Sequence, residues 1–427
     1  MAACTKIFPK VFRTGEKQKI CVKIDGAAEN ATVKIRIQGM ERYTTPHKSY
    51  RIDEYERYPL VEMARVSCSV YELEYDFPYE EKYHIAVYVD DAPVLRHAYI
   101  YALDKDLFSL KALKGDTHMH SNRSDGEGTP VEVACDYRGA AYDFIAITDH
   151  HKMHPSVEAK AVLDPLTKEF TVFRGEEVHN HDMGYFHIVN FGGEICVNDI
   201  IENELQFVDS EVERIMNSTE FPSGVDSYAC AYRIFVSEQI KRGGGLAIMA
   251  HPCWEAYGEY NMQMEDLVYL WKNGKFDALE VLAGCDTPPS NNGNNLQTAI
   301  WADLRAEGCK IPVLGASDAH SRAKPQSLFN KQFSIVFAES VSEIKSAIKD
   351  ERSVAVLRLS DNNYYLFGRL RYVKYARFVL DEYFPTYEKL CKKHADALFA
   401  ACESKNIDEL HKIEAEISEY RNSFFSA

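Results

Sequence analysis

Residues 144–151 of the chain read Phe-Ile-Ala-Ile-Thr-Asp-His-His, so that a short apolar run ends abruptly in ionisable residues. A short apolar run bounded by polar residues is typical of a buried β-strand. Similar runs recur between about residues 110 and 358, and helical segments lie between several of them. This alternation favours a parallel α/β sheet or barrel. The runs that we expect to form strands are 144–147, 186–189, 246–249, 278–282 and 311–314.

Further histidines and carboxylates follow or open the strands of the same segment. In an α/β barrel, the active site lies at the carboxyl ends of successive strands. His118 and His120 lie two apart on an extended chain, so their side chains point the same way and can bind one ion. Five such groups, each at the same position relative to its strand, indicate that they share one site. Besides Thr-Asp-His at 148–150, the groups are GDTHMHSNRSDG at 115–126, FRGEEV at 173–178 with His187, AHP at 250–252 and GASDAH at 315–320.

These motifs, in this order, resemble those of the PHP family, which is named for polymerase and histidinol phosphatase. The resemblance covers about residues 112–340 and implies a distorted seven-stranded (β/α) barrel with the activity of a metal-dependent phosphoesterase. It also implies a trinuclear metal site, carried over residue by residue from the family's motifs. His118, His120, Glu177 and Asp318 would hold the first ion; Glu177, His187 and His251 the second; and Asp125, His150 and His320 the third.

The chemistry of these residue types agrees with that implication. Imidazole and carboxylate together suit Mn, Fe or Zn, and two or three such divalent ions would activate water for attack on phosphorus. We expect Glu177, Asp318 and His320 to be catalytic, with Asp318 or an ion steadying the charge that develops. Glu176 and Glu177 are adjacent, and only one can point inward from a strand; the family's Gly-x-Glu pattern selects Glu177.

The substrate's phosphate requires protein cations as well as metal ions. Arg123, Arg138, Arg322 and Lys324 are candidates because they lie near the motifs. His179 either extends the site toward the substrate or is a solvated loop residue. We expect Asp149 to orient a neighbouring ligand or cap a turn, and Cys253 to be a buried neutral thiol.

Three domains are expected. Residues 1–108 alternate apolar and polar side chains, which predicts a small antiparallel β-sandwich. Residues 109–358 would form the barrel, with a mostly helical insertion at about 195–240. Residues 359–427 have helical spacing and would form a C-terminal helical extension.

Composition limits the partners. A formal net charge of −16 argues against an extended nucleic-acid surface, but not against a small phosphorylated substrate, a nucleotide or a short oligonucleotide. Eleven cysteines without a Cys-x-x-Cys pair favour reduced thiols and a cytoplasmic protein. We find no signal sequence and no apolar run of the ~20 residues that a membrane span needs, so we expect no membrane partner.

Two other functions fit parts of this pattern. An amidohydrolase, which would hydrolyse a C–N bond, also has His-x-His on its first barrel strand, but it needs a strand-borne lysine where this chain has Glu177. A binding or scaffold protein could retain metal for stability alone. The full set of expected ligands disfavours that second alternative.

Overall fold

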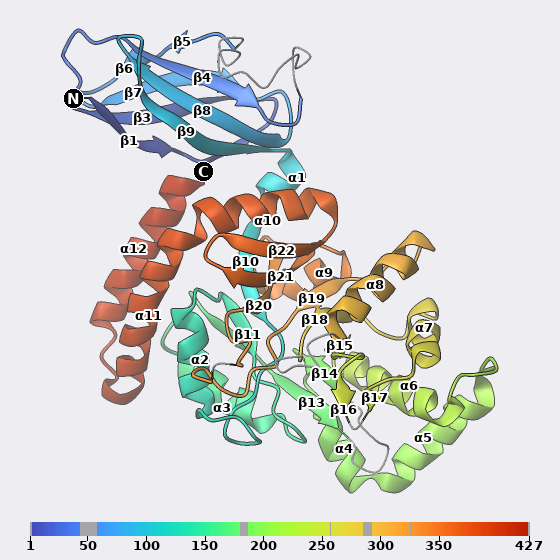
Figure 1. Cartoon of the computed structure of the whole chain (residues 1–427). Helices are drawn as coiled ribbons and strands as arrows, with labels where there is room; N and C mark the ends of the chain where they lie inside the picture. Colours follow the sequence, from blue (N-terminus) through green and yellow to red (C-terminus); the bar gives the residue numbers. More distant parts are fainter. Residues whose placement is uncertain are drawn as a thin grey trace. The chain divides into compact units, whose positions relative to one another are not determined.

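The computed structural model describes residues 2–42, 58–179, 187–256, 258–284, 293–324 and 326–425. The chain is mixed α/β and forms two compact units (Figure 1). The first unit comprises Met1–Leu110, Asp381–Tyr383 and Ala415–Ala427, and the second comprises Lys111–Leu380 and Phe384–Glu414. The three-part division at residues 108 and 358 stays a prediction about which segments fold on their own.

The first unit contains two sheets that share one hydrophobic core. Within β3, Ile20, Val22 and Ile24 are buried while their neighbours are more exposed, as the alternation of the sequence predicts. The pairing is antiparallel except between β2 and β9. One sheet has the order β1 (Ala3–Phe8), β3 (Lys17–Asp25), β7 (Val70–Asp76), β6 (Ala64–Arg65), and the other β2 (Val11–Arg13), β9 (Ala92–Leu103), β8 (Glu81–Val89), β4 (Val33–Gly39), β5 (Val61–Glu62).

The second unit contains two larger sheets that carry the motifs. Strands β10, β11 and β12 are parallel, as are β15, β18 and β19. The six-stranded sheet has the order β12 (Thr171–Phe173), β11 (Phe144–Ala146), β10 (Lys111–Asp116), β20 (Gln332–Ala338), β21 (Ser353–Ser360), β22 (Asn363–Gly368). The five-stranded sheet has the order β13 (Gly175–His179), β14 (His187–Phe191), β15 (Leu246–Met249), β18 (Ala278–Leu282), β19 (Val313–Gly315).

The expectation of a parallel α/β sheet or barrel holds only for part of each sheet, because both sheets are mixed. Strand β14 is antiparallel to β13 and to β15, and β20 is antiparallel to β10. Only residues 180–186 separate β13 from β14. A parallel pair needs a crossover of about a dozen residues or more, so these two strands can pair only in the antiparallel sense.

Helices account for most of the remaining described residues of the second unit. The insertion at about 195–240 is helical, as predicted. The C-terminal segment is helical from Leu370 onward, but residues 363–368, which the prediction included in the helical extension, form strand β22. Pro385 lies in the first turn of α11, where a missing N–H costs nothing. The helices of this unit are α2 (Pro130–Gly139), α3 (His154–Leu163), α4 (Val197–Asn203), α5 (Leu205–Ser218), α6 (Ser227–Arg242), α7 (Met264–Lys272), α8 (Gly293–Ala306), α9 (Ile344–Lys349) and α11 (Phe384–Ser404). Helices α10 (Leu370–Glu382) and α12 (Asp408–Phe424) begin in this unit and end in residues of the first.

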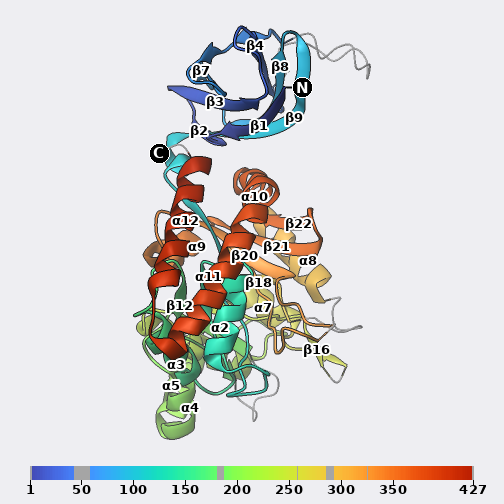
Figure 2. The same ribbon diagram turned by 90° about the vertical axis from the view of Figure 1, so that its left-hand side faces the viewer.

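Helix α11 is fixed to α2 by a buried polar network. Arg138 of α2 donates from Nε to Nδ1 of His394 at 3.1 Å and from Nη1 to the Tyr387 hydroxyl at 3.1 Å. Tyr387 in turn donates to the carboxylate of Asp143. Arg138 is fully buried, so its candidacy as a phosphate ligand is wrong. Figure 2 shows α11 lying alongside α2.

Among the described residues, no helix combines the length and the apolar character that crossing a bilayer requires.

Candidate metal centre

The ends of strands from both sheets of the second unit deliver the ionisable side chains to one place. His118 and His120 follow β10, and Asp318 and His320 follow β19. The two segments run side by side through a bridge between Met119 and Ala319. A second bridge joins His150, after β11, to Glu177 on β13. His187 opens β14, and His251 follows β15.

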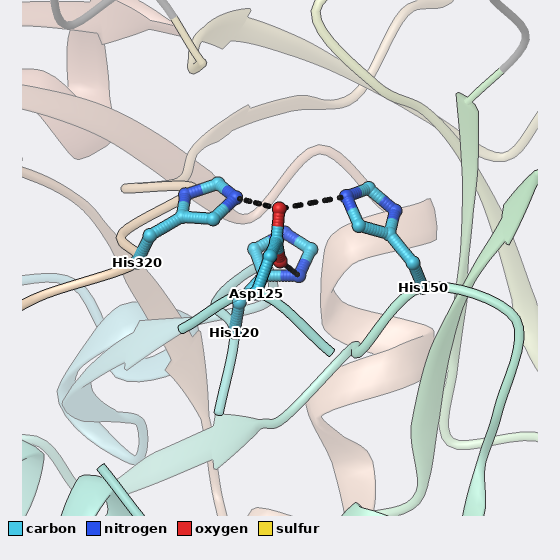
Figure 3. A group of neighbouring side chains, drawn as sticks. All are labelled: His120, Asp125, His150 and His320. Atoms are coloured by element: carbon cyan, nitrogen blue, oxygen red, sulfur yellow. Dashed lines mark ion pairs between the residues drawn. The ribbon is translucent and has the colours of Figure 1, made fainter. Parts of the chain in front are cut away.

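The nine side chains expected as metal ligands lie together in three groups, each with ligand atoms within 4.8 Å of one another. The third group also contains His120, which the family resemblance did not assign to the third ion. Figure 3 shows the Asp125 carboxylate of this group between the rings of His320 and His150. The first group is His118, His120, Glu177 and Asp318, the second is Glu177, His187 and His251, and the third is His120, Asp125, His150 and His320.

Glu177 occupies the middle of the cluster and belongs to two of the groups. Its Oε1 lies 2.8 Å from Nδ1 of His187 and 3.3 Å from Nε2 of both His118 and His251. Its Oε2 lies 2.9 Å from Nδ1 of His150 and 3.5 Å from Nε2 of His120. The two oxygens of one carboxylate therefore face different sets of imidazoles, which is the geometry of a bridging ligand.

Glu176 points to the opposite face of β13. Its carboxylate accepts hydrogen bonds from Asn190 Nδ2 at 2.8 Å, from the Val197 backbone at 2.7 Å and from Asn198 Nδ2 at 2.8 Å. Successive side chains of a strand point to opposite faces, so Glu177 alone of the pair reaches the cluster.

Asp318 lies at the rim of the cluster in a tightly built loop. Its Oδ1 is 2.9 Å from Nε2 of His120 and 3.2 Å from Nε2 of His118. A side chain at Gly284, whose φ is +63°, would place its Cβ 2.7 Å from the ring of His251 and 2.9 Å from Oδ2 of Asp318. Glycine at 284 is therefore required by the close approach of these two side chains.

Burial and charge together set the protonation of the cluster. Burial alone would lower the pKa of His118, but Glu177, Asp318 and Glu280 outweigh it and raise that pKa well above its usual range. Burial and the neighbouring His320 lower the pKa of His120 to about 4. A neutral imidazole is the form that binds a metal ion, so His120 is prepared as a ligand at neutral pH.

Several buried atoms of the cluster make no hydrogen bond. Among the described residues these include Nε2 of His118, Nδ1 of His120 and Oε2 of Glu177. Buried polar atoms are nearly always hydrogen-bonded, and one expected explanation of such exceptions is an ion. Imidazole and carboxylate donors without a thiolate fit Mn, Fe or Zn. Cys253 is buried, and burial raises the pKa of its thiol to about 12, so it is neutral as predicted.

Glu280 on β18 supports the cluster from behind. Its Oε1 lies 3.1 Å from Nδ1 of His118, and its Oε2 accepts a hydrogen bond from the His251 backbone at 3.2 Å. Histidine ligands commonly donate their second ring N–H to a carboxylate, which fixes the tautomer. We did not predict this role from the sequence. The available signal was a single carboxylate inside the apolar run 278–282.

Asp149 organises the loop that carries Asp125. Its carboxylate accepts hydrogen bonds from the backbone N–H of Ser121 and of Ser124, both at 3.0 Å, and from both serine hydroxyls. Of the two roles predicted for Asp149, these contacts fit the capping of a turn.

The cations expected to bind phosphate are engaged elsewhere. Arg123 pairs with Glu158 at 2.7 Å, Lys324 pairs with Glu127 at 2.9 Å, and Arg322 pairs with Asp136. Their role toward a substrate stays a prediction.

His179 lies beside the cluster. Its Nδ1 is 3.0 Å from Nε2 of His151, and its ring centroid is 4.6 Å from that of His187. Burial and the neighbouring His187 lower the pKa of His179 to about 3, so the ring is neutral at pH 7.

No protein-family model matches the chain, and a search of curated proteins finds no match. Solved structures do resemble it. One is a two-domain protein from Bacteroides vulgatus containing a predicted PHP-like metal-dependent phosphoesterase, with 18% identity and a TM-score of 0.40. That match covers 58% of this chain and 66% of the other, which is just under two thirds of its length.

Two further structures match at similar levels. A candidate metal-dependent phosphoesterase from Bifidobacterium adolescentis is 19% identical, with a TM-score of 0.35 over 51% of this chain and 91% of that one. An amidohydrolase from Chromobacterium violaceum is 20% identical, with a TM-score of 0.33 over 49% of this chain and 88% of that one. Proteins described as PHP-like phosphoesterases are thus among the structural neighbours, and we base the proposed function on this chain's own residues.

Proposed function

We propose that this chain is a metal-dependent phosphoesterase of the PHP type, which hydrolyses a phosphate ester on a site of two or three divalent ions. The second unit would be a distorted seven-stranded barrel and the first a β-sandwich. The observation that supports the proposal most strongly is the position of Glu177. Its buried Oε1 faces His187 and His251 of the second group and its Oε2 faces His120 of the first, so the carboxylate could bridge two ions.

The three groups of side chains would each hold one Mn, Fe or Zn ion. The first and second would share Glu177, and the first and third would share His120. Bound ions would supply a nucleophilic water at neutral pH and offset the charge on the phosphoryl oxygens.

The residues of the chain would position the reactants. Burial would raise the pKa of Asp318, but His118 and the hydrogen bond from His120 hold it far below its usual range. Asp318 therefore stays ionised. Its carboxylate can accept a hydrogen bond from the attacking water and so orient that water. This replaces its expected role of steadying developing charge, because a carboxylate does not stabilise an oxyanion.

His320 is the more exposed partner of this pair. Its Nδ1 donates to the Asp318 carbonyl oxygen at 2.9 Å, and its Nε2 lies 3.3 Å from Oδ2 of Asp125. Burial opposes protonation of His320, but Asp125 and Asp318 raise its pKa to about 9. The imidazole can thus hold a proton that a leaving group could accept, or bind an ion through Nε2.

The test is a screen of metal-loaded protein against phosphomonoesters, phosphodiesters, short oligonucleotides and hydantoin-like amides, run in water enriched in heavy oxygen. We expect ester hydrolysis with the label in phosphate, because attack is at phosphorus. Label in the alcohol would contradict this mechanism. Turnover of amides alone would favour an amidohydrolase, although Glu177 occupies the position where that chemistry needs a modified lysine.

A further inference from the structure

Two cysteines meet between the helices α2 and α11 of the second unit. Cys135 lies on α2, and Cys402 lies near the end of α11. The thiol of Cys135 makes a hydrogen bond with the sulfur of Cys402. Both cysteines are free thiols in the structure. Because they are far apart in the sequence, the packing of the two helices is what brings them together.

The register of the two helices places the same residues opposite each other. A side chain at Gly139 of α2 would place its Cβ 3.5 Å from the Cβ of Ala395 on α11, so the two backbones approach closely there. Cys135 lies about one turn before Gly139, and Cys402 lies about two turns after Ala395, each on the same face of its helix. The helices therefore run antiparallel, with the two cysteines on the faces that contact each other. A disulfide requires such a close approach, because its Cα atoms lie within about 7 Å.

Both sulfur atoms lie where a thiol reaction can involve them. Cys402 is partly exposed, so a small reagent can reach it from solvent. Cys135 lines a cleft of about 1000 Å³ that begins at His120 and His320. It is only 6% exposed, which hinders direct attack by a bulky reagent. As the second thiol of an exchange, however, Cys135 has to reach only Cys402.

The surroundings of the two thiols set the order in which they react. Burial raises the pKa of Cys135, and the neighbouring Cys402 raises it further. Burial also raises the pKa of Cys402, but Lys405 and the hydrogen bond from Cys135 oppose that rise. The thiolate is the nucleophile in disulfide exchange. Cys402 is both the more exposed and the more easily ionised thiol, so it reacts first.

We propose that Cys135 and Cys402 are a redox pair, which a low-molecular-weight disulfide of the glutathione type converts into a reversible disulfide between α2 and α11. The Cys402 thiolate attacks one sulfur of the reagent, a mixed disulfide forms, and one glutathione thiolate leaves. The Cys135 thiolate then attacks the sulfur of Cys402, and the second glutathione thiolate leaves. The two protein thiols lose two electrons and two protons, and the two glutathione molecules gain them.

The experiment exposes the full-length, metal-loaded protein to glutathione buffers with an increasing oxidised fraction, and then alkylates the remaining thiols. Peptide mapping without reduction should find Cys135 joined to Cys402, with a loss of two alkylated thiols. Excess reduced glutathione should restore both. The bond closes a loop of more than half the chain, so the oxidised protein should melt several degrees above the reduced protein.

Variants separate this pair from general oxidation of cysteines. Cys135→Ser should stop the reaction at a mixed disulfide between Cys402 and glutathione, because the second thiol is missing. Cys391→Ala removes another buried cysteine of α11 and is the matched control, which should form the bond as wild type does.

Wild-type protein that keeps both thiols free in fully oxidised glutathione would overturn the proposal. Wild-type protein that stops at the mixed disulfide of Cys402 would also overturn it, because Cys135 would then be unable to reach that sulfur. An equal rise of Tm on oxidation of Cys402→Ser would show that the stabilisation has another source, and would contradict the proposed bond.

Discussion

The carboxylate of Glu280 lies 3.1 Å from Nδ1 of His118, while Nε2 of the same ring faces Glu177 and Asp318 at 3.3 and 3.2 Å. Glu280 can thus hold a proton of His118 on the nitrogen that points away from the cluster. A metal ion that displaced the proton from the other nitrogen would bind there, at the position expected for the first ion.

Replacing Glu280 by glutamine should therefore weaken metal binding. Loss of such a supporting carboxylate typically lowers metal affinity by about 10–100-fold. Competition with a chelator measures the effect. The matched control is Asp277→Asn, which removes a carboxylate that accepts from the Ala247 backbone at 3.0 Å, away from the cluster. That variant should lose stability and keep its metal affinity; equal affinities for wild type and Glu280→Gln would show that Glu280 plays no part.

Glu177→Gln and Glu176→Gln should affect different properties of the protein. We expect the first to abolish hydrolysis and lower metal content, because it removes a negative oxygen that faces several imidazoles. The second should keep the metal but reduce the free energy of unfolding by about 1–3 kcal/mol, because an amide cannot accept all the hydrogen bonds that Glu176 receives. Elemental analysis and urea unfolding distinguish the two. Similar metal contents in both variants would refute the assignment of Glu177 as the bridge.

The motif residues could be predicted because each is local to one strand end. His118, His150 and Asp318 follow their strands by a few residues, so the sequence specifies where they emerge. Glu280 belongs to no such motif. Its role became visible only when the structure placed the ring of His118 beside β18. The antiparallel β14 was missed, although the short separation from β13 was visible in the sequence.

The surroundings of the centre could not be predicted for a different reason. Whether Arg322 meets a phosphate or Asp136 depends on packing between segments that are 186 positions apart. The contact between Arg138 and His394 spans 256 positions. The sequence revealed a helical C-terminal segment, but only the packed structure places its helix α11 against α2.

His394 should make stability depend on pH. Burial, with the adjacent Arg138, lowers the pKa of His394 from 6.5 to about 2. Below pH 6.5 the unfolded chain therefore binds a proton that the folded chain does not, and stability falls as pH falls. The slope from this one group approaches about 1.4 kcal/mol per pH unit.

Unfolding of wild type and His394→Gln between pH 7.5 and roughly 5 tests this. The glutamine variant should lose less stability than wild type as the pH falls. His411→Gln, at an exposed position of α12, should behave as wild type. Parallel curves for wild type and His394→Gln would contradict the buried neutral imidazole.

The central claim is tested most directly by titrating chelator-treated protein with Mn, Fe or Zn while measuring phosphate release from an activated phosphoester. We predict no turnover without metal, recovery that requires more than one equivalent per chain, and a loss of several orders of magnitude in Asp318→Asn at full metal loading. Undiminished turnover after metal removal, or no phosphate release by the fully metallated protein, would contradict the proposed function.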